Sequence, residues 1–165
     1  MSPLILEGLE IGIVALGIQA AFGAAVYELY PLPNTLSLFI KAIAPDAQSA
    51  VGSSTDNNVA SKAFIWTPQR GVQDLGHLRS FWADAVDVSD NGAVVVGTSS
   101  PTGSYAPVLA LWTNLSILGI DVGQATGYSI SGDGSRVLAK AEKWFLWSST
   151  HGRLDLTETF ATVLE

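Results

Sequence analysis

The strongest candidate for chemistry is a short stretch in which oxygen-bearing side chains alternate along the chain. Asp87, Ser89 and Asn91 occupy every second position, and Gly92 follows them. This spacing matches the opening of a calcium-binding loop, where oxygen ligands alternate before a turn glycine. The twelfth position of such a loop is Thr98, whereas calcium loops place a bidentate carboxylate there. We therefore interpret the stretch as a hairpin turn and predict no metal site.

Serine and histidine residues raise a second class of chemistry, acyl transfer. Residues 127–131 read Gly-Tyr-Ser-Ile-Ser, and Ser131 stands where a nucleophile elbow requires its second glycine. Only His77 and His151 could act as the base, because the chain has two histidines. Each of them lies in a sequence typical of a turn or strand end. We expect both histidines to be solvated and predict no nucleophile.

Paired carboxylates are a third possibility, because glycoside hydrolysis needs two of them facing one cleft. Asp74 could pair with Asp84 or with Asp87. However, Asp74 is matched by Asp155 at the same distance from a tryptophan, and a unique catalytic acid would not be repeated in this way. The sequence thus predicts a chain without catalytic residues and without a cofactor.

The composition describes a folded chain with few charges. Its 165 residues are 48% hydrophobic and 14% charged, and the net charge is −7. The eight Lys and Arg residues are scattered singly, so no basic stripe is available for phosphates, and we exclude nucleic acid as a partner. Cysteine is absent, which excludes disulfides and thiolate metal sites. Sixteen glycines beside many Ser, Thr and Val residues favour short strands and tight turns.

The N-terminal segment differs from the rest of the chain. Residues 11–27 contain no charge, and Pro31 and Pro33 follow them. This run predicts a helix at the lower limit of membrane-spanning length, with a signal peptide or a buried element as alternatives. We therefore divide the chain into an apolar segment at 1–33 and a β-domain at 39–165. If the segment is a membrane-spanning helix, it contacts the membrane through residues 11–27.

The β-domain is built from repeats of about 40 residues. Residues 63–76 contain an Ile-Trp-Thr group and a Leu-Gly pair, and residues 85–97 contain a Val-rich hairpin. The same order recurs at 108–139, so that Ser89 and Ser131 are 42 residues apart. A third unit begins at Phe145 and contains only the first half of the pattern. Residues 43–52 resemble a degenerate copy of the hairpin. The pattern predicts about three repeats, with the last one incomplete.

Each repeat has the composition of four short antiparallel strands. Asp-Asn-Gly at 90–92 and Gly-Asp-Gly at 132–134 are hairpin turns between Val-rich runs. Four strands in about 42 residues is the size of one propeller blade, so we predict an all-β, propeller-like fold. The residues predicted to form the structural core of the repeats are Trp66, Trp112, Trp147, Leu75, Leu118, Leu156, Gly92 and Gly134.

The strings AFIWTPQRGVQDLG and AVDVSDNGAVVVG, within residues 63–97, resemble the HAF family of extracellular repeats. The resemblance weakens over 108–139 and covers half a unit after residue 145. It implies an extracytoplasmic bacterial protein with stacked β-repeats, and it carries over no catalytic residue.

Two functions remain open at the level of sequence. In the first, the repeats form a non-enzymatic scaffold at the cell surface that presents or binds a glycan or a protein. In the second, residues 11–27 anchor the chain in a membrane, where it serves as an accessory subunit of a membrane protein complex. In either case, an incomplete repeat leaves an unpaired strand edge at residues 145–165, which predicts an oligomer or closure of the domain on itself.

Overall fold

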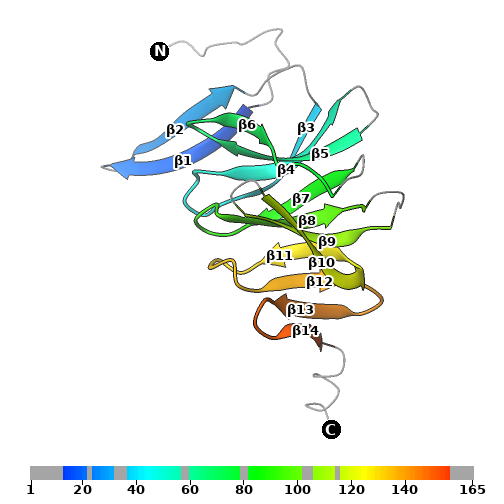
Figure 1. The fold of residues 1–165 in the computed structure, drawn as a ribbon. Coiled ribbons are helices and arrows are strands. Elements are labelled where there is room, and N and C mark those ends of the chain that lie inside the picture. The colour runs from blue at the N-terminus through cyan, green and yellow to red at the C-terminus, as the bar shows by residue number, and fades with distance from the viewer. Residues whose placement is uncertain are drawn as a thin grey trace.

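The structure is a computed structural model, and it describes residues 13–21, 24–31, 37–56, 60–78, 82–101, 106–113 and 116–156. Residues 37–155 form three antiparallel sheets of four strands each (Figure 1). Repeat sheet 1 contains β3 (Ser37–Ile43), β4 (Ala50–Asp56), β5 (Ala60–Thr67) and β6 (Gly71–Asp74). Repeat sheet 2 contains β7 (Ala83–Val88), β8 (Val94–Ser99), β9 (Val108–Thr113) and β10 (Ser116–Gln124). Repeat sheet 3 contains β11 (Thr126–Ile130), β12 (Val137–Lys140), β13 (Trp144–Ser148) and β14 (Gly152–Asp155).

The strands of each repeat sheet are ordered as they occur in the chain, so every connection within a sheet is a hairpin. The prediction of an all-β fold with three four-stranded repeats is confirmed. The boundaries of the structural repeats differ from those expected from the sequence, which placed a tryptophan strand and the following hairpin in one repeat. A tryptophan strand and the hairpin after it, such as β5 and β7–β8, belong to neighbouring sheets. With the observed boundaries the third sheet has all four strands, so the prediction that the last repeat is incomplete is wrong.

The first hairpin of each sheet is built in the same way. The backbone N–H of Ala44, Ser89 and Ser131 donates at 2.9 Å to a carbonyl five residues later. The residue three positions along, which is Ala47, Gly92 or Gly134, has a positive φ of 56–75°. Glycine adopts this conformation without strain, which explains its presence in the second and third hairpins.

A β-bulge interrupts the first strand pair of each sheet at equivalent residues. The register slips around Lys41 in β3, Val86 in β7 and Tyr128 in β11. A bulge leaves one residue unpaired and turns its side chain in a new direction. The three repeats therefore share their irregularities as well as their strands, although the bulged residues are chemically different.

The core lies between the sheets. One buried cluster joins sheets 1 and 2 and includes Val51, Ile65 and Trp112. A second cluster joins sheets 2 and 3 and includes Val96, Leu109 and Phe145. Each sheet thus contributes alternate residues to its two faces, as the period of a strand requires. A third cluster, Ala50, Phe64 and Trp66, lies on the other face of sheet 1.

The N-terminal segment forms strands where a helix was expected. Residues 13–31 contain β1 (Ile13–Ala21) and β2 (Ala24–Pro31), which pair as a two-stranded antiparallel sheet. The helix predicted over residues 11–27 is therefore wrong for the residues that the structure describes. β-branched and aromatic residues such as Ile13 and Tyr27 suit strands, and Gly17 lowers helix propensity. The described residues form no helix that is long and apolar enough to cross a membrane.

Candidate interaction surface

Asp87, the first residue of the calcium-like stretch, ties two sheets together. Its Oδ2 accepts hydrogen bonds from the Ser129 hydroxyl at 2.7 Å and from the backbone N–H of Ile130 at 2.9 Å. Its Oδ1 accepts a bond from the N–H of Val88. Oδ2 is therefore used in the contact between β7 and β11 and Oδ1 in a local contact within β7, which explains an aspartate at this position without a metal ion.

The remaining oxygens of this stretch stabilise the hairpin itself. The Ser89 hydroxyl donates to Asn91 Oδ1 at 2.9 Å, and the same oxygen accepts the N–H of Ala93. Asp133 takes the role of Asn91 in sheet 3, where it accepts bonds from Ser131 and Ser135. Among the described residues, no group of three His, Asp or Glu side chains could hold a metal ion.

The hydrogen bonds around Asp133 also change its acidity. The Ser131 hydroxyl, the Ser135 backbone N–H and the Ser135 hydroxyl lower its pKa from 3.8 to about 2. Hydrogen bonds donated to a carboxylate favour its charged form. The carboxylate is fully exposed and lies in a hairpin turn. This shift thus reports turn geometry, and it does not indicate a catalytic acid.

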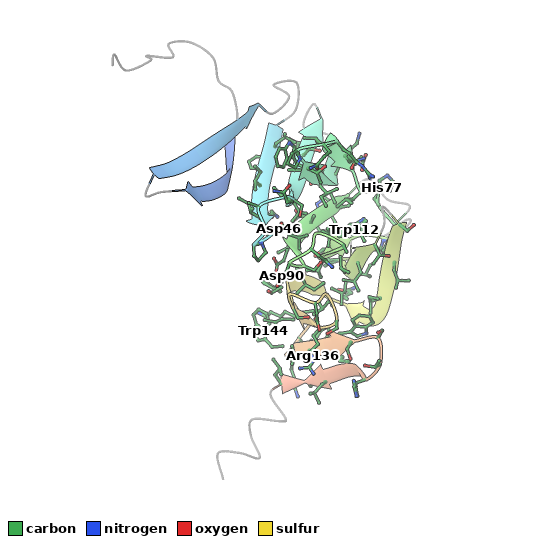
Figure 2. All side chains as sticks on the ribbon, turned by 90° about the vertical axis from the view of Figure 1, so that its left-hand side faces the viewer. Asp46, His77, Asp90, Trp112, Arg136 and Trp144 are labelled. Carbon is green, nitrogen blue, oxygen red and sulfur yellow. The ribbon has the colours of Figure 1, made fainter. Side chains whose placement is uncertain are left out.

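The histidines and the serines of the hypothetical acyl-transfer site occupy separate structures. His151 lies in the turn between β13 and β14, where it contacts Ser148 and the Thr150 hydroxyl, the latter at 2.8 Å. His77 lies in the connection after β6, beside the upper sheets in Figure 2, and is exposed. Ser131 belongs to the hairpin described above and bonds Asp133. The structure therefore brings neither histidine into a hydrogen bond with Ser131.

The carboxylates proposed for glycoside hydrolysis are also structural. Asp74 accepts the backbone N–H of Gly76 at 2.7 Å, and Asp84 forms an ion pair with Lys41 of sheet 1. Asp74 lies opposite Phe64 in its sheet, and Asp155 lies opposite Phe145 in the third sheet. These equivalent positions support the interpretation that the aspartates repeat because the sheet repeats.

The residues expected in the core differ in their burial. Trp66, Trp112 and Leu75 are buried, and the Trp112 indole N–H donates to the carbonyl of Gly76 at 3.3 Å. Trp147 is partly buried against the cluster between sheets 2 and 3, and Leu156 is half-buried.

Leu118 is 58% exposed, so its assignment to the core is wrong. It lies on the edge strand β10, whereas the first strand of sheet 3 packs across β7, β8 and β9. The two glycines have other roles. Gly92 and Gly134 have positive φ, and an added Cβ would approach Ser49 Oγ and Val94 Cγ2 to 2.7 and 2.8 Å, respectively. Both turns therefore sit tightly against the preceding sheet.

An exposed face on sheet 3 is the main surface that the sequence did not reveal. In β13, Phe145 is buried and faces sheet 2, whereas its neighbours Trp144 and Leu146 point to the opposite face. Trp144 is 37% exposed, and its ring lies 4.6 Å from that of Tyr128. We call this side of sheet 3, with Tyr128, Leu138, Lys140, Trp144, Leu146 and Leu154, the open face.

The two ends of the open face differ in character. At one end, Lys140 Nζ lies 5.5 Å from the centre of the Trp144 ring, a cation–π contact. At the other end, Leu146 and Leu154 line a mostly apolar hollow of about 280 Å³, together with Arg136, Trp147 and the turn between β13 and β14. Figure 2 shows Arg136 and Trp144 on the lowest sheet. Apolar and aromatic side chains with a few cations are typical of a protein-binding surface.

A second, polar cavity lies where sheets 2 and 3 meet. Its volume is about 560 Å³, and its lining includes Lys140, Glu142, Arg153, Gln124 and Thr126. The Arg153 guanidinium is already engaged, because it bonds Asp155 and lies 4.3 Å from the centre of the Phe145 ring. The cavity therefore has fewer free polar groups than its lining suggests.

The open face could have been found from the sequence by a closer alignment of the repeats. Trp144 precedes Trp147 by three residues, as Ala63 precedes Trp66 and Leu109 precedes Trp112. A tryptophan therefore replaces a small or aliphatic residue at one position of the third repeat. That substitution was the available signal.

Comparisons with known proteins support the fold and leave the family open. No family model and no curated protein matches this sequence. Among solved structures, the chain is similar to TolB from Acinetobacter baumannii, with a TM-score of 0.53 and 15% identity, over 81% of this chain and 35% of the TolB chain. The chain thus spans about a third of the length of TolB. This likeness shows a shared β-sheet fold, and membership of the HAF family stays a prediction.

Proposed function

We propose that this chain is a non-enzymatic β-repeat scaffold that works outside the cytoplasm and binds another protein. A glycan at the cell surface is the alternative ligand. The scaffold role rests on the regular stack of sheets, and the location rests on the resemblance of residues 63–97 to extracellular repeats. The likeness to TolB supports the repeat fold on which that resemblance depends.

The observation that carries this proposal is the use made of the polar side chains. Asp87 connects two sheets, Asp84 binds Lys41, and Asp133 closes a turn. These carboxylates would be the natural candidates for catalysis, and each is occupied by a contact that the repeat needs. In contrast, the open face presents apolar and aromatic side chains whose burial would favour association.

A location experiment tests the proposal in cells that make the protein. A protease added to spheroplasts should digest the chain, and carbonate should release it from membranes. Protection in spheroplasts that disappears on lysis would contradict an extracytoplasmic location. A chain that only detergent releases would favour the membrane-anchored accessory subunit.

A truncated chain is the matched variant for this experiment. We expect that deletion of residues 1–33 leaves the β-signal in circular dichroism, because the repeat sheets begin at Ser37. If the truncated chain keeps its fold and its location, the apolar segment is not the anchor. Loss of cooperative melting would instead make the segment part of the folded core.

A further inference from the structure

At one position of the repeat, the side chain is buried in sheets 1 and 2 and exposed in sheet 3. Ala63 pairs with Ser53 in sheet 1, Leu109 with Thr98 in sheet 2, and Trp144 with Lys140 in sheet 3, at equivalent places in the register. Ala63 and Leu109 are 0% exposed, whereas Trp144 is 37% exposed. The same side of the sheet is therefore buried twice by the sheet that follows it, and among the described residues no sheet covers it in sheet 3.

The next residues along this face show the same difference. Val51 and Ile65 in sheet 1, and Val96 and Leu111 in sheet 2, are all buried. Their equivalents, Leu138 and Leu146, are only half-buried. Leu118 of sheet 2 and its equivalent in sheet 3, Leu154, are both exposed, so this position does not contribute to the difference between the two sheets. The uncovered area is the strip that a neighbouring first strand occupies in the other two sheets.

Gly127 shows how such a first strand is seated. It is buried in β11, where an added Cβ would come within 2.8 Å of the Gly97 carbonyl oxygen and of Val96 Cγ2, and within 2.9 Å of Leu109 Cδ1. β7 carries Ala85 at the equivalent position, and Ala85 shares a buried cluster with the smaller Ala63. The larger Leu109 is thus packed against glycine on the following strand, and the smaller Ala63 is packed near alanine. Because Trp144 is larger still, we expect glycine at the equivalent position of the strand that packs on it.

A second copy of this chain has no matching face to offer. Each sheet packs on the preceding one through its tryptophan-bearing face, and in sheet 1 that face is already covered, because Phe64 and Trp66 are 1% and 3% exposed. Two open faces would meet with like charge. Residues 125–156 contain four of the eight basic residues and only three of the fifteen acidic ones. Both features argue against a second copy of this chain as the occupant.

We propose that the open face of sheet 3 binds the first strand of a further four-stranded repeat sheet, one that the described residues do not supply. The proposal rests on the binding function above and names the kind of partner. The strand should have small residues at the positions of Ala125 and Gly127, and the partner's first turn should have a glycine against Arg136, as Gly134 packs against Val94. A glycan is less suited to the face, because the Tyr128 and Trp144 rings are tilted by 58° and form no flat platform.

A chain extended by one repeat tests this docking. The full chain is followed after Glu165 by a copy of residues 125–156, in which Trp144→Phe distinguishes the copy. The ten residues 156–165 then join the two units, compared with the eight residues 75–82 that join β6 to β7. We expect hydroxyl-radical labelling of the original Trp144 to fall to the level of buried Trp112. The control copy also carries Gly127→Leu, which should block docking and restore the labelling.

The other outcomes contradict the proposal. Unchanged labelling of Trp144 in the extended chain would overturn it. If the single-sheet copy does not fold, a copy of residues 82–156 supplies two sheets that already pack together, and unprotected Trp144 in that chain has the same meaning. A dimer of the unextended chain that Trp144→Asp dissociates and Leu118→Asp preserves would identify a second copy as the occupant. Protection of Trp144 by soluble oligosaccharides would identify a glycan. These measurements use purified protein, so they are independent of the location experiment.

Discussion

Repeat sheets 2 and 3 share one local design and differ in what surrounds them. Both begin with a bulged strand, turn through a Ser-x-[Asn/Asp]-Gly hairpin, and carry tryptophan on the third strand. Sheet 2 is packed on both faces, because one buried cluster lies on each side of it. Sheet 3 is packed on one face and exposes Trp144 on the other. The comparison shows that local sequence determines the sheet, whereas its neighbours determine which side chains are core.

The largest expected difference concerns the repeated tryptophans. Trp112 is 1% exposed between sheets 1 and 2, so Trp112→Ala should lower the free energy of unfolding by about 3–5 kcal/mol. Trp147 is only partly buried, so Trp147→Ala should cost about 1–3 kcal/mol, because less apolar area is lost. Urea unfolding of both variants measures the difference. Equal losses would mean that Trp147 is buried against sheet 2 as fully as Trp112 is buried against sheet 1.

The equivalent positions 109 and 144 give a sharper test with a smaller effect. Leu109→Ala removes a fully buried side chain and should cost about 2–5 kcal/mol. Trp144→Ala removes a larger side chain, yet it should cost about 1 kcal/mol or less, because the ring is exposed and loses mainly its contact with Tyr128. The same unfolding experiment applies. A greater loss for Trp144→Ala than for Leu109→Ala would show that the open face is covered.

The hairpin turns should respond alike in covered and uncovered sheets. Gly134→Ala places a Cβ at a φ of 75° and close to Val94, which should cost about 1–2 kcal/mol from backbone strain alone. Ala47→Gly relieves the same conformation in sheet 1 and should stabilise the chain by about 1 kcal/mol or less. Thermal melting of both variants checks the signs. Destabilisation by Ala47→Gly would contradict the equivalence of the turns.

The smallest expected effect is a pH dependence of the third hairpin. The pKa of Asp133 is lower in the folded chain than its ordinary value of 3.8, so its ionised form stabilises the fold above that pH. This contribution is lost as the pH falls from 3.8 through about 2. Asp133→Asn keeps an acceptor, as Asn91 does in sheet 2, and should flatten the pH dependence of the melting temperature in this range. Asn91→Asp should make the melting temperature depend more steeply on pH. If neither variant changes this pH dependence, the hydrogen bonds to Asp133 are not its cause.

Strand content and repeat number could be predicted because their signals are local. Hairpin turns such as Asp90-Asn91-Gly92 and the alternation of Val86 and Val88 with polar residues depend on near neighbours in the chain. The boundaries of the structural repeats could not be predicted in the same way. Trp66 and the hairpin at 85–97 are neighbours in sequence, but the connection at 75–82 crosses from one sheet to the next.

The errors in the predicted core have a similar cause. Leu118 has the same sequence context as Leu75, but it is exposed on the edge strand β10, whereas β11 packs mainly on β7, β8 and β9. The exposure of Trp144 could not be predicted from its position, because an apolar residue at a repeated position usually indicates core. Burial depends on whether another sheet follows, and a single repeat carries no information about that. For the same reason, the open face is defined by the difference in burial between equivalent positions of the three sheets.

A disulfide cross-link tests the stacking of the repeat sheets most directly, because the chain contains no cysteine. The backbone N–H of Asp90 donates to the carbonyl of Gly132, and a Cβ on Gly132 would lie 2.6 Å from Asp90 Cγ. The pair Asp90→Cys and Gly132→Cys is thus close enough for a disulfide between sheets 2 and 3. We expect this variant to cross-link fully within one molecule on mild oxidation, and the control pair Asp46→Cys and Gly132→Cys to remain reduced. A reduced 90–132 pair in the folded chain, or equal cross-linking of both pairs, would contradict the stacked architecture.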